Sequence, residues 1–101
     1  MAKVYISEYQ EIARSGSSGA LPDVGQEPAI TTQTVAIGGT STQSSAFNAS
    51  TKFVRIHTDA ICSVLFGSNP TADANSPRLA AGQTEKFGVR AGEKVAVITN
   101  T

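Results

Sequence analysis

The chain has 101 residues, enough for one domain, and its eight basic residues balance its eight acidic ones to a formal net charge of +0. Nucleic-acid binders usually carry a basic excess because phosphate contacts supply much of their affinity, so we expect no nucleic-acid partner. No stretch approaches the roughly 20 apolar residues that span a bilayer, and we expect no membrane partner. A single cysteine, Cys62, excludes an internal disulfide and indicates a reducing compartment.

The first 28 residues are predicted to form an arm and linker outside the main domain. Ser7 and Gln10 have the spacing of a capping box, which predicts a short helix from about Glu8 to Arg14. A helix this short is marginal alone, so it must dock on its own domain or on a neighbour. The docking candidates are Tyr5, Ile6, Tyr9 and Ile12. Ser15 to Pro28 is rich in Gly, Ser and Pro, which indicates an extended linker.

Residues 29–101 carry strand signals throughout and are predicted to form a β domain. Clear strands are expected at 30–37, 53–58, 61–66, 84–89 and 94–99, with weaker ones at 45–48 and 78–80. Short strands about ten residues apart, separated by turn signals, are typical of a sandwich or small barrel. The predicted fold is all-β: a small antiparallel β-sandwich or jelly-roll-like barrel, with an extended N-terminal arm that carries a short helix.

The strand at 53–58 predicts a contact surface. Val54 and Ile56 face one side of it, and Phe53, Arg55 and His57 face the other. We predict that these three residues form one contact stripe. Ile61 to Phe66 is apolar nearly throughout, which indicates burial on both faces of the next strand. Charged residues are only 16% of the chain, and neutral polar surface costs less to desolvate, so the composition favours assembly with other chains.

The chemistry-bearing residues do not form a recognisable active site. His57 is the only histidine, and Cys62 and Asp59 are its only nearby candidates for a metal site, which usually has three or four ligands. A Cys–His nucleophile pair requires a lowered thiol pKa and an orienting third group, whereas a free cysteine is more often a small buried hydrophobe. We therefore predict no catalytic residue, no metal, no cofactor and no enzymatic activity. A cupin-like metalloenzyme would draw on several histidines.

Several elements of the chain resemble small proteins encoded beside the major capsid gene in tailed bacteriophages. They are Ser45-Ala46-Phe47, Phe53-Val54-Arg55-Ile56, Ile61-Cys62, Phe66-Gly67-Ser68-Asn69-Pro70-Thr71-Ala72, Leu79-Ala80-Ala81-Gly82, Phe87 and Val95-Ala96-Val97-Ile98. The resemblance covers about residues 35–101 and the opening Lys3-Val4-Tyr5-Ile6-Ser7. Related β modules act as capsid cement or decoration proteins, commonly as trimers, and this class has no catalytic residues to carry over.

The resemblance implies a structural virion protein that binds and stabilises a phage capsid shell. Its expected location is the capsid surface, after synthesis in the bacterial host cytoplasm. Its expected partners are the major capsid protein and sister copies of the chain, with a homotrimer favoured. The alternative is a receptor- or glycan-binding module of a head or tail fibre. Glycan sites use exposed aromatic platforms, and here Trp is absent and aromatic residues are only 6% of the chain.

Overall fold

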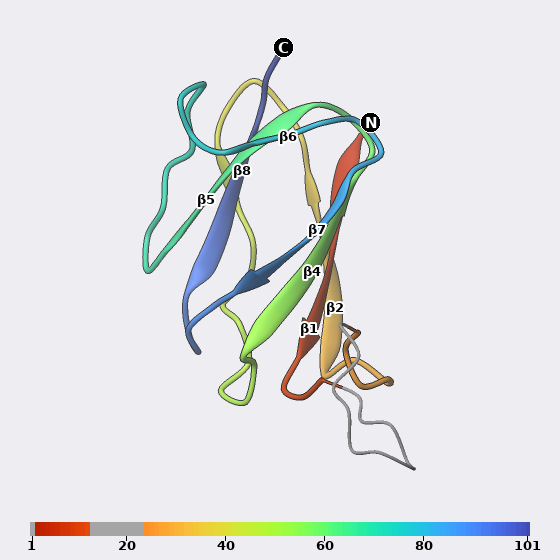
Figure 1. Cartoon of the computed structure of the whole chain (residues 1–101). Helices are drawn as coiled ribbons and strands as arrows, with labels where there is room; N and C mark the ends of the chain where they lie inside the picture. The colour runs from red at the N-terminus through yellow and green to blue at the C-terminus, as the bar shows by residue number, and fades with distance from the viewer. Residues whose placement is uncertain (1, 13–23) are drawn as a thin grey trace.

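The computed structural model describes residues 2–12 and 24–101, and these form two four-stranded antiparallel sheets (Figure 1). The order in the first sheet is β2 (Thr31–Ala36), β1 (Lys3–Tyr9), β4 (Phe53–Thr58) and β7 (Thr84–Gly88). The order in the second sheet is β3 (Thr42–Gln43), β8 (Lys94–Thr99), β5 (Cys62–Gly67) and β6 (Arg78–Leu79). The predicted all-β class is confirmed. No helix among the described residues is long and apolar enough to cross a membrane.

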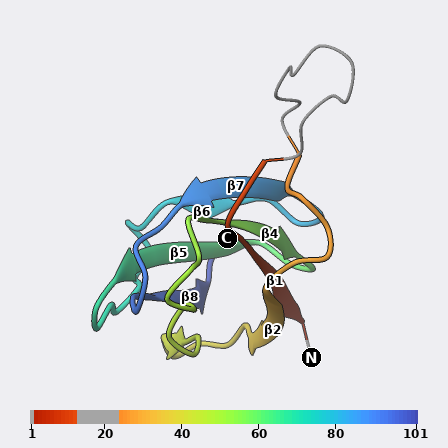
Figure 2. The ribbon, with the colours of Figure 1, turned by 90° about the horizontal axis from the view of Figure 1, so that it is seen from below.

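The two sheets share one apolar core, and Figure 2 shows them from below. Strand side chains alternate between faces, so every second residue of β1 and β4 points inward. The fully buried branched aliphatic side chains from the two sheets are Val4, Ile6, Val54, Ile56, Val64, Val95 and Val97. Each contributes roughly 1.5–3 kcal/mol when taken out of water. Phe47, from the segment between β3 and β4, is also part of this core.

The strong strand predictions agree with the structure to within about a residue at each end, as expected where alternation is clear. The weak strand predicted at 45–48 is wrong, because the strand in that region is Thr42–Gln43. Ser44 and Phe47 instead donate single backbone bonds to Val95 and Glu93. Burial on both faces holds only for the first half of β5: Cys62, Ser63 and Val64 are buried. Leu65 is exposed because its side of the strand faces outward.

The predicted N-terminal helix is not present, because Glu8 and Tyr9 are the last residues of strand β1. Ala13 and Arg14, at the end of that prediction, lie outside the described residues. Val4, Ile6 and Glu8 alternate inward along β1, and the strand is hydrogen-bonded to β2 on one side and β4 on the other. Lys3–Tyr9 therefore belongs to the sheet and not to an arm outside it.

The predicted linker at 15–28 lies outside the described residues as far as residue 23. From residue 24 onward the chain returns to strand β1. Gly25 forms a β-bridge with Ile12, and the Gln26 amide donates to the Glu11 carbonyl at 2.9 Å. This returning segment also covers part of β1, as described below.

A buried carboxylate fixes β1 to the rest of the domain. Glu8 is 1% exposed and points into the space between β1 and the loop that follows β3. Its Oε1 accepts from the Asn48 amide at 2.8 Å and from the Thr51 hydroxyl at 2.7 Å, and its Oε2 accepts from Gln33 at 3.2 Å. Gln33 in turn exchanges two hydrogen bonds with the backbone of Ser45. The network therefore ties β2 and the 45–51 loop to one carboxyl group.

We predict that Glu8→Ala lowers the free energy of unfolding by about 2–4 kcal/mol, since buried donors would lose their acceptor. Urea unfolding followed by circular dichroism measures the change. Glu11→Ala is the matched control, because Glu11 is exposed and should change stability by no more than about 0.5 kcal/mol. Equal effects of the two substitutions would contradict a structural role for the Glu8 carboxylate.

Candidate functional site

The predicted contact stripe lies on the outer face of the first sheet. Val54 and Ile56 are fully buried on the inner side of β4, so Phe53, Arg55 and His57 point away from the core. Arg55 is exposed, whereas Phe53 and His57 are half-buried. The stripe therefore has the orientation that its sequence pattern indicates.

Strand β1 adds a second row to the stripe. In the antiparallel register, Tyr5 is opposite His57, Ser7 is opposite Arg55 and Tyr9 is opposite Phe53. The Tyr5 and His57 rings lie 6.3 Å apart between centroids, and the Tyr9 and Phe53 rings are stacked at 5.3 Å. We call the set Tyr5, Tyr9, Phe53, Arg55 and His57 the aromatic face. The sequence predicts all five of these as contacts, from two separate segments, and the register brings the segments together.

Polar contacts hold Tyr5 and His57, at the other end of the aromatic face from Phe53, in place. His57 Nδ1 lies 2.8 Å from the Thr84 hydroxyl on β7. The Tyr5 hydroxyl lies 3.5 Å from Asp59 Oδ2, which also accepts the Lys3 amide at 3.3 Å. Strands β1, β4 and β7 therefore contribute to the same surface, and the rings of Tyr5 and His57 lie on the outer face of their sheet.

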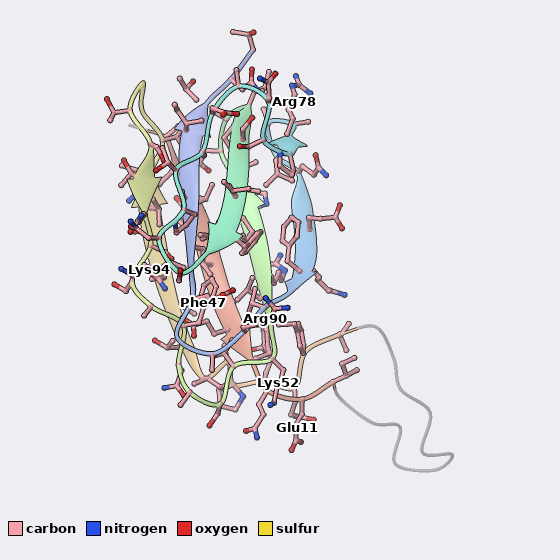
Figure 3. The ribbon with its side chains drawn as sticks, turned by 90° about the vertical axis from the view of Figure 1, so that its left-hand side faces the viewer. Glu11, Phe47, Lys52, Arg78, Arg90 and Lys94 are labelled. Carbon is pink, nitrogen blue, oxygen red and sulfur yellow. The ribbon has the colours of Figure 1, made fainter. Side chains whose placement is uncertain are left out.

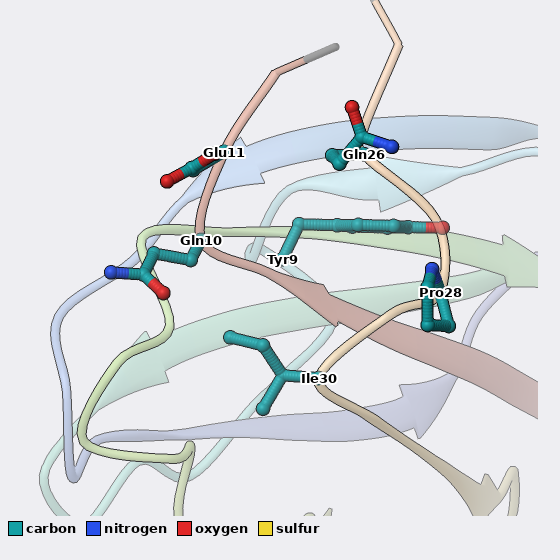
Figure 4. A pocket seen from close by; sticks show the side chains of 6 residues that line it. All are labelled: Tyr9, Gln10, Glu11, Gln26, Pro28 and Ile30. Carbon is teal, nitrogen blue, oxygen red and sulfur yellow. The ribbon is translucent and has the colours of Figure 1, made fainter.

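The returning segment covers Tyr9, which is only 5% exposed although it points outward from the sheet. Figure 4 shows its ring edge-on, among Gln10, Glu11, Gln26, Pro28 and Ile30. The Tyr9 hydroxyl donates to Glu27 Oε2 at 2.6 Å. A Cβ added at Gly25 would lie 2.5 Å from Tyr9 Cδ1, so only glycine allows the backbone to approach this ring so closely. Tyr9 therefore positions the returning segment and is not itself an open contact.

An apolar hollow adjoins the aromatic face at the end where Phe53 lies. It is lined by Ile12, Val24, Phe53, Phe87, Gly88 and Lys86. Ile12 and Val24 are 39% and 52% exposed, which is high for aliphatic side chains of this size. The structure thus brings Ile12 and Phe53, two of the predicted contact residues, to one place.

Ile6 does not belong to this surface. It is 1% exposed in the core between the sheets, because its position in β1 alternates with Tyr5 and Ser7. Sequence reasoning missed Val24, Gly25 and Glu27, since it treated the linker as structureless, and it also missed Phe87. Phe87 lies opposite the buried Val54 and packs against the core, so it reaches the hollow from the inner side of β7.

His57 and Cys62 do not face each other. His57 is on the outer face of the first sheet, while Cys62 lies fully buried in the second sheet with its Sγ 3.5 Å from the Thr58 hydroxyl. Burial raises the pKa of the Cys62 thiol, which disfavours the reactive thiolate. Within the described part of the chain, no group of three or more His, Cys, Asp or Glu side chains could hold a metal ion.

The basic residues in the described part of the chain are spread over the molecule. Figure 3 shows Arg78 toward one end and Lys52 and Arg90 toward the other. Lys52 and Arg90 line a shallow hollow together with Glu93, so positive and negative groups are mixed there. No known protein family, curated protein or solved structure matches the chain in the comparisons made with each. The resemblance to phage proteins therefore stays a prediction.

Tyr9 should make stability depend on alkaline pH. Its hydrogen bond to Glu27, together with burial, raises the pKa of the Tyr9 hydroxyl above its ordinary value. A raised folded-state pKa gives stability that is fully present below about pH 10 and lost as pH rises through the folded-state pKa. Urea unfolding from pH 8 to 11 should show this loss in the natural chain and a smaller loss in Tyr9→Phe. A Tyr5→Phe control should keep the full loss, and identical pH profiles for all three would refute the assignment.

Cys62 should be inert in the folded protein, because it is fully buried and its thiol pKa is raised. A colorimetric thiol reagent should react with it on the timescale of global unfolding, and at once in denaturant. Rapid stoichiometric labelling of the native protein would contradict the position of Cys62 in the core.

Proposed function

We propose that the chain is a structural virion protein that binds and stabilises a phage capsid shell, and that the aromatic face contacts the major capsid protein. The observation that carries the proposal is the grouping of Tyr5, Phe53, Arg55 and His57 on one outer sheet face. Tyr and Arg are enriched among the residues that dominate binding energy at protein interfaces, and Phe is enriched in interface composition. The phage context itself comes from the sequence resemblance.

The surroundings of the aromatic face suit a protein partner. Thr32 and Thr34 of β2 lie opposite Ser7 and Tyr5, and Thr84 of β7 lies opposite His57. These side chains are neutral, so their desolvation costs less than that of charges. A large apolar side chain that becomes fully buried contributes roughly 1.5–3 kcal/mol, and many copies on one shell would add avidity. A weak contact per copy would therefore suffice for stable decoration.

The exposed pair Ile12 and Val24 supplies a second contact in this proposal. These side chains extend the aromatic face beyond the edge of Phe53 through the apolar hollow. The segment 1–28 cannot act as a removable arm, because its residues 3–9 form a central strand. Deleting it would expose the core and would test folding, not shell binding. A capsid-surface location and assembly with sister copies of the chain remain part of the proposal.

The decisive experiment is cosedimentation of the purified full chain with shells assembled from the major capsid protein that the proposed function expects to be encoded beside it. We predict that replacing Phe53, Arg55 and His57 together by Ser weakens shell binding by more than about tenfold, since interface anchors often contribute 2 kcal/mol or more each. Circular dichroism and thermal unfolding check that the variant remains folded.

The control replaces Leu65 and Arg78 by Ser on the exposed side of the second sheet. It removes one apolar and one basic side chain and should leave shell binding unchanged. If the natural chain does not sediment with the shells, the proposed function is wrong. If both variants bind as the natural chain does, the function stands and the aromatic face is ordinary surface.

A further inference from the structure

Strand β2 is an unusual sheet edge. The edge strands among the described residues are β2 and β7 in the first sheet and β3 and β6 in the second. Proteins protect such edges by short strands, charges or proline, because free backbone groups invite pairing with another chain. β3 and β6 have two residues each, and β7 carries Glu85 and Lys86. β2 has six residues, Thr31–Ala36, without charge, proline or glycine.

The register shows which backbone groups of β2 point away from the sheet. The Ile37 amide donates to the Ala2 carbonyl at 3.0 Å, so Ile37 faces β1, as do Val35 and Gln33 at alternate positions. The Asp59 amide donates to the Lys3 carbonyl, which places the backbone of Lys3 toward β4 and agrees with this alternation. The amide and carbonyl groups of Thr32, Thr34 and Ala36 consequently point outward from the edge.

We propose that β2 pairs antiparallel with β2 of a second copy of the chain, about a two-fold axis at Thr34. In this register Thr34 lies opposite Thr34 of the other copy and Thr32 lies opposite Ala36, so all three outward positions find backbone partners. The first sheet of one copy and the first sheet of the other then form one continuous eight-stranded sheet across the axis. Pairs of small β-branched side chains are favourable neighbours across antiparallel strands.

The second copy is the occupant that the edge fits because the pairing is self-complementary. Thr31–Ala36 has no charge, so no like charges meet across the two-fold axis. On the inner side, Val35 would lie opposite Gln33, whose amide is already held by Glu8 and Ser45.

The pairing has a structural consequence. A two-fold axis perpendicular to the sheet keeps the outer faces of both copies on the same side, so a dimer would present two aromatic faces together. Across the continuous sheet, Tyr5 would be followed by Thr34, then by Thr34 of the second copy and finally by Tyr5 of the second copy. This inference is independent of the proposed function, because it concerns the edge of the sheet and would hold for any partner of the faces.

The first test is sedimentation velocity of the full chain over a range of concentrations. We expect a dimer that dissociates on dilution. Thr34→Lys should raise its dissociation constant by more than about tenfold, because two lysines would meet at the axis. Thr34→Val should remain dimeric, and it keeps the test meaningful if the lysine variant folds poorly. Thr84→Lys places the same charge on the far edge of the same sheet and should also remain dimeric.

The second test fixes the register by disulfide formation. Opposed residues in a hydrogen-bonded antiparallel pair have Cα atoms about 5.5 Å apart, within the range of a disulfide. Thr34→Cys should therefore give a crosslinked dimer on mild oxidation. Thr32→Cys should not, because its counterpart would be roughly 14 Å away along the strand. The buried Cys62 should take no part.

A chain that stays monomeric at all concentrations would overturn the proposal, as would an oligomer that Thr34→Lys and Thr84→Lys affect equally. A trimer insensitive to Thr34→Lys would do the same. Equal crosslinking of Thr32→Cys and Thr34→Cys would overturn the two-fold register. These outcomes leave shell binding to be decided separately by cosedimentation.

Discussion

The placement of β1 between β2 and β4 is the constraint on which the other features depend. Its inward residues supply Val4 and Ile6 to the core and Glu8 to the polar network, while its outward residues supply Tyr5 and Tyr9 to the aromatic face. Without β1, β2 would have no partner in its sheet and β4 would lose one of its two neighbours. The opening of the chain is therefore as much part of the domain as the strands that follow residue 29.

Alternating patterns made much of the fold predictable, and competing local signals account for the main error. Phe53–Thr58 and Lys94–Thr99 alternate clearly and were predicted with their observed bounds. For Lys3–Tyr9 the capping spacing of Ser7 and Gln10 predicts a helix, but in the structure Val4 and Ile6 alternate inward along a strand. Two long-range strand pairings decide the outcome, and no local pattern encodes them. The burial of Glu8 cannot be predicted from its neighbours in the sequence either, because its hydrogen-bond partner Thr51 is 43 residues away.

The sequence predicts the residues of the candidate site but not that its two segments lie side by side. One strand gives Phe53, Arg55 and His57 on a common side by simple alternation. That Tyr5 and Tyr9 complete this surface depends on the register between β1 and β4, and a shift by one residue would have turned both rings into the core. The stacking of Tyr9 between Phe53 and the backbone of Gly25 depends on a returning segment whose composition indicates only a linker.

The aromatic face and the β2 edge belong to one sheet but have different physical characters. The face offers side chains, with Tyr5 and Arg55 exposed above a buried support, and in the proposed function it would select its partner by shape and chemistry. The edge offers backbone groups in a neutral strand, and we propose a second copy of the chain as the strand that pairs with them. Among the four sheet edges that residues 2–12 and 24–101 form, β7 carries charges and β3 and β6 are short, whereas β2 is long and neutral. This asymmetry is the physical reason for which the proposed pairing is placed at β2 and not at the other edges.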